Sequence, residues 1–166
     1  DLNTCSYKFQ NWSPTSPAGS FPSNMKFVSF LDEDPTINSL IGVNTAGAYN
    51  LLSRTRINGL NNLGFSFINT TGSNSNPGFV TGKLGGAILA LKTSNLDSVS
   101  ISWKARTITA NPRKYAIRLQ YRIGDILEFS DFSPPVEYIG KTTNNDSLIF
   151  TNIKLPAALL NQPYVQ

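Results

Sequence analysis

The chain reads KYAIRLQYRI from Lys114 to Ile123, and this stretch decides the fold class. The apolar side chains fall on one face: Tyr115, Ile117, Leu119, Tyr121 and Ile123. The polar ones fall on the other: Lys114, Arg118, Gln120 and Arg122. A period of two is typical of a β-strand with one buried and one solvated face. The stretch therefore predicts an antiparallel β-protein.

The preceding stretch, SVSISWKAR from Ser98 to Arg106, repeats the alternation. Its apolar positions are Val99, Ile101, Trp103 and Ala105, and its outward positions are Ser100, Ser102, Lys104 and Arg106. We expect the two strands to lie side by side with their apolar faces inward. Together they would present a broad cationic face that can form many hydrogen bonds.

Further apolar runs separated by turn-forming residues extend this pattern along the chain. They predict strands at Cys5–Phe9, Met25–Phe30, Gly64–Ile68, Gly86–Leu91, Val136–Ile139 and Leu148–Leu155, with a start of another at Tyr164–Gln166. Short helical turns are expected at Ala46–Leu52 and Pro156–Leu160. The fold class is all-β: one domain over residues 1–166, an antiparallel two-sheet β-sandwich, jelly-roll-like, with one or two short helical turns.

Composition restricts the partners and the location. The net charge is +4, but no dense run of Lys and Arg marks a nucleic-acid-binding surface. No apolar stretch approaches the roughly 20 residues that span a bilayer. Only 14% of the 166 residues are charged, which is common in secreted β-proteins. The chain begins at Asp1 with no signal segment, and we expect a secreted, cell-surface protein in mature or excised form.

Catalytic motifs are missing from the sequence. The chain has no histidine, so no Ser-His-Asp triad can form and Cys5 has no histidine to act as its base. We therefore expect a protein that is not an enzyme and requires no cofactor. The one tight group of carboxylates is Asp32, Glu33 and Asp34, which is either a calcium site or a solvated acidic turn.

Candidate ligand-binding residues come from two places. The outward side chains of the two alternating stretches can form charge-assisted hydrogen bonds with carboxylates, sulfates or hydroxyl pairs; they are Lys104, Arg106, Arg118, Gln120 and Arg122. The alternative is that this face is merely solvated or packs against a neighbouring domain. Trp12 lies in a loop-like segment, where its indole would either stack on a sugar ring or close one end of the sandwich.

Several segments resemble a β-sandwich domain that recurs in large secreted multidomain proteins of environmental bacteria. They are Tyr7–Ser13, Ser16–Gly19, Pro22–Met25, Gly64–Asn69, Leu84–Ala87, Tyr115–Arg122 and Leu155–Ala158. The resemblance implies an extracellular, non-catalytic sandwich and assigns no ligand residue. The resembling domains continue beyond the counterpart of Asn161–Gln166 into a further strand, which predicts an open groove that another polypeptide could fill.

These observations predict a non-catalytic, extracellular module that binds extracellular material, with polysaccharide as its expected ligand. The alternative is a structural subunit of a fibre, in which neighbouring copies of the chain exchange a strand through Asp1–Tyr7 or Pro163–Gln166. Nucleic acid and a membrane span are not expected.

Overall fold

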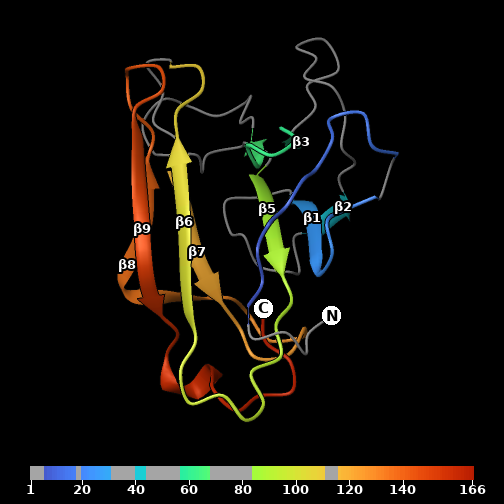
Figure 1. Cartoon of the computed structure of the whole chain (residues 1–166), viewed down its shortest axis with the longest axis vertical. Coiled ribbons are helices and arrows are strands. Elements are labelled where there is room, and N and C mark those ends of the chain that lie inside the picture. The colour runs from blue at the N-terminus through green and yellow to red at the C-terminus, as the bar shows by residue number, and fades with distance from the viewer. Residues whose placement is uncertain (1–5, 18–19, 31–39, 44–56, 68–83, 111–115) are drawn as a thin grey trace. The chain divides into compact units, whose positions relative to one another are not determined.

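The computed structural model describes residues 6–17, 20–30, 40–43, 57–67, 84–110 and 116–166 (Figure 1). Its paired strands are all antiparallel, and the one helical element among these residues is a short 3-10 turn. The all-β class is therefore confirmed. The described residues up to Ala90 form one compact unit, unit 1, and those from Leu91 form another, unit 2. The two-sheet sandwich and the single domain over 1–166 stay predictions.

Unit 1 contains a three-stranded sheet and a two-stranded one. The sheets have the orders β2-β1-β5 and β3-β4, from β1 (Met25–Phe30), β2 (Leu40–Val43), β3 (Ile57–Gly59), β4 (Phe65–Phe67) and β5 (Leu84–Leu89). The strand predicted at Met25–Phe30 is confirmed residue for residue. The short strands β2 and β3 were not predicted. The strand predicted at Cys5–Phe9 is wrong for its described part, because residues 6–9 pair with no strand.

Aromatic side chains build the core of unit 1. Phe27 is fully buried and stacks on Trp12, with ring centroids 4.1 Å apart. The rings of Phe21 and Phe65 meet Phe27 at 5.5 and 4.9 Å. Gly59 lies against the backbone of Trp12, where an added Cβ would be 2.2 Å from the Trp12 carbonyl oxygen. Only glycine therefore allows this close approach.

Unit 2 is built from two antiparallel pairs, β6-β9 and β7-β8, and the turn η2 (Ala157–Leu159). The strands are β6 (Ser100–Arg106), β7 (Ala116–Tyr121), β8 (Ser130–Ile139) and β9 (Ser147–Lys154). The expectation that β6 and β7 pair side by side is wrong, since each pairs with a later strand. The outward side chains of β6 and β7 therefore belong to two different sheets. Figure 1 shows β6 and β9 as neighbouring arrows, with β7 behind them.

The inner faces of both pairs contribute to one core. Its buried residues are Phe132, Leu155, Leu159 and Val165. Apolar side chains from all four strands pack against them, including Ile101, Leu119, Val136 and Ile153. Trp103 also faces inward, half-buried, and stacks on Phe150 at 4.3 Å. The predicted inward direction of Val99, Ile101, Leu119 and Tyr121 is confirmed, while Tyr115 lies outside the described residues.

Hydrogen bonds tie the two pairs together at opposite ends. At one end, the Tyr138 hydroxyl on β8 contacts the Thr107 hydroxyl just after β6 (2.7 Å) and donates to the Asp146 carbonyl (2.9 Å). At the other end, Val165 pairs with Leu91 on one side and Ile123 on the other. The end of β6 therefore lies near the start of β7. Figure 1 shows the two strands pointing in opposite directions.

Candidate functional site

The outer face of β6 and β9 carries cations with no carboxylate on either strand. Lys104 and Arg106 are exposed on β6, as predicted, and Lys154 is exposed at the end of β9, opposite Ser100. None of the three forms an ion pair within the described part of the chain. Exposed Ile149 lies directly across from Lys104, and Ser147 across from Arg106. We call these residues of β6 and β9, with Ser100, Ser102 and Asn152, the basic face.

A bulge gives the middle of the basic face extra polar groups. Ser102 lies opposite both Thr151 and Asn152, because the register shifts between Ile101 and Trp103. Asn152 adopts a positive φ of 55°, a conformation that asparagine tolerates better than most residues. Its N–H donates to the Ser102 hydroxyl oxygen at 3.0 Å. The Ser102 hydroxyl hydrogen remains available to a ligand.

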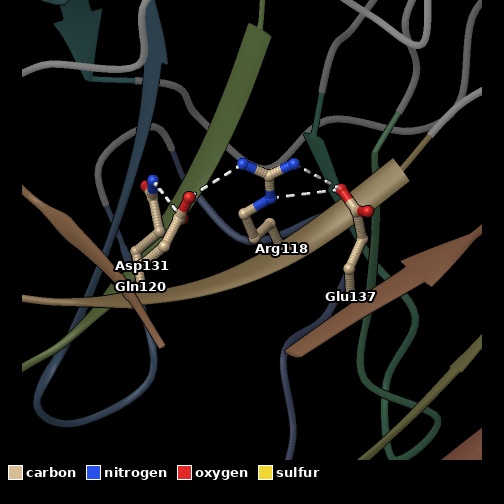
Figure 2. Close-up of polar contacts among 4 residues, drawn as sticks. All are labelled: Arg118, Gln120, Asp131 and Glu137. Atoms are coloured by element: carbon tan, nitrogen blue, oxygen red, sulfur yellow. Dashed lines mark hydrogen bonds and ion pairs between the residues drawn. The ribbon is translucent and has the colours of Figure 1, made fainter. Parts of the chain in front are cut away.

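The outer face of β7 and β8 is different, because its arginine is already paired (Figure 2). Arg118 lies across from Glu137, and its Nε and Nη2 donate to Glu137 Oε1 at 3.2 and 3.1 Å. Its Nη1 donates to Asp131 Oδ2 at 2.9 Å. Gln120 donates to the other oxygen of Asp131 at 3.0 Å. The donors that sequence analysis assigned to a ligand are therefore largely used within the sheet.

The two carboxylates also govern the electrostatics of this face. Burial lowers the pKa of Arg118, but the hydrogen bonds and charges of Glu137 and Asp131 outweigh that effect, so the pKa ends above its ordinary value. One cation faces two carboxylates on these strands, so the local charge is negative. An anionic ligand that approaches Arg118 would be repelled by both carboxylates.

Arg122 is not on an exposed face, so its predicted place beside Arg118 and Gln120 is wrong. It is 3% exposed, because β7 ends at Tyr121 and the following loop folds back over the arginine. Its Nε donates to Gln166 Oε1 at 2.7 Å, and its Nη1 donates to the Leu127 carbonyl at 3.1 Å. The guanidinium carbon lies 4.4 Å from the centre of the Phe129 ring. Burial lowers the pKa of Arg122.

Trp12 is a core residue and offers no exposed indole. It is 3% exposed, and its Nε1 donates to the Ser20 carbonyl at 2.8 Å. Of the two alternatives for Trp12, the structure supports the buried ring, while the sandwich whose end it would close stays a prediction. Stacking on a sugar would require the ring to leave the Phe27 contact.

The predicted metal ligands Asp32, Glu33 and Asp34 lie outside the described residues. Within the described ranges, no three His, Cys, Asp or Glu side chains gather closely enough to hold a metal ion. No helix there has the length and apolar character needed to cross a bilayer.

Two features of the site were missed in the sequence. Lys154 falls at the end of a predicted strand, but its membership of the basic face follows only from the pairing of β9 with β6. Asp131 and Glu137 were not recognised as partners of Arg118, because the prolines between them read as a turn. No family model, curated protein or solved structure matches the chain.

Proposed function

We propose that the protein is a non-catalytic, extracellular binding module whose basic face holds an acidic polysaccharide. The observation that carries the proposal is the set of exposed cations on β6 and β9 without a carboxylate on either strand. Unpaired cations attract anions and keep their donors free. Secretion is inferred from composition and from the resemblance described above.

The spacing of the cations suits a polymer better than a small anion. Lys104 and Arg106 are two residues apart on β6, or about 7 Å at the rise of a β-strand. Lys154 lies opposite Ser100, about 13 Å further along the strand from Lys104. A single small anion cannot contact all three, whereas a chain with a repeated carboxylate or sulfate can.

The groups between the cations suit the rest of a sugar chain. Ser100, Ser102 and Ser147 offer hydroxyl groups, and Ile149 offers an apolar contact for the C–H face of a sugar ring. The expected binding is electrostatic in large part, so it weakens as salt screens exposed charges.

The test is affinity electrophoresis in gels containing polygalacturonate, with dextran as the neutral polymer. The variant K104Q/R106Q/K154Q removes the basic-face cations, and K8Q/K26Q/K92Q removes the same charge from exposed positions elsewhere. We expect at least a tenfold loss of affinity for polygalacturonate in the first variant and less than a threefold loss in the second. Equal losses in the two variants would show a general effect of net charge, and an unchanged first variant would refute the proposal.

Strand exchange between copies, the alternative, is not favoured for the C-terminal segment. Val165 is 1% exposed and is already paired on both sides within unit 2. Gln166 exchanges two backbone hydrogen bonds with Arg122, each 2.9 Å long. The N-terminal donor Asp1–Tyr7 lies largely outside the described residues and stays a hypothesis that deletion of residues 1–6 would test.

A further inference from the structure

The loop after β7 exposes two large apolar side chains between two acids. Ile126 is 84% exposed and Leu127 is 55% exposed. Asp125 and Glu128 on either side are also exposed, and neither forms an ion pair within the described ranges. We call residues 125–128 the acidic loop. Adjacent exposed apolar side chains with a polar rim are typical of a surface that contacts another protein.

Arg122 holds the acidic loop in one shape. Its guanidinium donates to the carbonyl of Leu127 itself and lies over the ring of Phe129, which closes the loop. The other side of Arg122 is fixed by Gln166. A loop that is ordered before binding loses less conformational entropy when it docks. The two exposed side chains are therefore presented on a fixed support.

The basic face is complementary to this loop in both charge and polarity. Lys104 and Arg106 lie along one strand, and Ile149, which is 62% exposed, lies across from Lys104. Acids flank apolar groups on the loop, and cations adjoin an apolar group on the face. The loop follows the end of β7, whereas Arg106 lies at the end of unit 2 where β7 starts. One copy cannot bring its own loop to the Arg106 end of its own basic face.

We propose that the acidic loop of one copy docks on the basic face of a second copy. Ile126 and Leu127 then contact Ile149, while Asp125 and Glu128 approach Lys104 and Arg106. The two surfaces differ, so the contact is heterologous and its repetition builds a row of copies. One loop on one sheet face is a small interface, so we expect weak, concentration-dependent association. An acidic polysaccharide would compete for the same cations.

The experiment is sedimentation velocity of the whole chain at increasing concentration in low salt. We expect the mean sedimentation coefficient to rise with concentration for the native chain and to fall back on addition of salt. The variant I126S/L127S should remain monomeric, whereas L63S/I139S, which removes two exposed apolar groups elsewhere, should associate like the native chain. A native chain that is monomeric up to about 1 mM would overturn the proposal, as would association of I126S/L127S equal to that of L63S/I139S.

Charge reversal gives a second, independent arm. D125K/E128K and K104E/R106E should each fail to self-associate. An equimolar mixture should associate again, because the native loop of K104E/R106E meets the native basic face of D125K/E128K, and the two reversed surfaces also match in charge. A mixture that stays monomeric refutes the proposed pairing. Retention of I126S/L127S by polygalacturonate should be unchanged, so loss of self-association and loss of polymer binding are separate results.

Discussion

The two sheets of unit 2 share a core but differ on their outer faces. Sequence assigned the outward cations of β6 and β7 to one binding face. In the structure, Arg118 on β7 is bound by Asp131 and Glu137, while Lys104 and Arg106 on β6 have no acidic partner on either strand of their sheet. The difference arises from the partner strand: β8 brings carboxylates, and β9 brings hydroxyl groups, Ile149 and a further lysine. Exposure alone therefore does not identify a binding cation; its cross-strand neighbours do.

The largest loss of stability should follow a substitution in the shared core, because this core supports both outer faces. Leu159 is 1% exposed and belongs to the core that contacts both pairs. We expect Leu159→Ala to lower the free energy of unfolding by about 2–5 kcal/mol, as for other buried leucines. Urea denaturation measures the loss, and hydrogen exchange should show faster exchange in β6-β9 and β7-β8 alike. Faster exchange in one pair only would contradict the shared core.

The second-largest loss of stability should follow substitution of Arg122, because it is a buried arginine with fixed hydrogen-bond partners. Arg122→Met keeps much of the side-chain volume but leaves the Leu127 carbonyl and Gln166 without their donor. We expect a loss of about 2–3 kcal/mol in the free energy of unfolding, since hydrogen bonds to charged groups contribute more than neutral ones. A change below about 0.5 kcal/mol, the usual range for surface substitutions, would mean that Arg122 is exposed in solution.

Arg118 offers the matched comparison. It lies on β7, whereas Arg122 follows the end of that strand, and its side chain is 37% exposed with ion pairs in contact with solvent. Exposed ion pairs stabilise proteins by about 0–1 kcal/mol, so Arg118→Met should lower the free energy of unfolding by less than that. Urea denaturation of the two variants side by side measures the difference. A loss as large as that of Arg122→Met would show that the pairing in Figure 2 supports the fold itself.

The smallest expected effect is an increase in polymer binding by the outer face of β7 and β8. D131N/E137Q removes both charges from the partners of Arg118 while keeping groups of similar size. Arg118 then becomes an uncompensated cation, and we expect affinity for polygalacturonate to rise about two- to threefold through charge attraction. D125N/E128Q, which removes two exposed carboxylates from the acidic loop, is the control for net charge. An equal rise in the affinity of the control would show that net charge, and not the release of Arg118 from its carboxylates, determines the affinity.

Local patterns predicted the longer strands, but they missed the short strands β2 and β3 and did not show which strands pair. Met25–Phe30, Ser98–Arg106 and Leu148–Leu155 alternate or are strongly apolar, and each forms a strand within two residues of its predicted bounds. β8 begins six residues before its predicted start, because Pro134 and Pro135 read as a separator. They fall between Asp131 and Val136, where the register with β7 shifts and the regular ladder is interrupted. Proline is tolerated at such a bulge.

The candidate site was predicted only in part, because the pattern within one strand does not show which distant segments contact it. Alternation identified Lys104 and Arg106 as outward residues, and the structure agrees. It also placed Arg122 outward, but no pattern within β7 can reveal that the following loop and Gln166 cover that position. The missing information is long-range: Gln166 is far from Arg122 along the chain, and β9 is far from β6. Pairing of distant segments decides which outward side chains remain free.

The most direct test of the central claim is a titration of the isotope-labelled protein with polygalacturonate fragments, followed by amide chemical shifts. It reports on both sheets in one experiment. We expect the largest shift changes at residues 100–106 and 147–154 of the basic face, with little change at Arg118 and along β8. Changes concentrated on β7 and β8, or no change at any concentration of the fragments, would contradict the account.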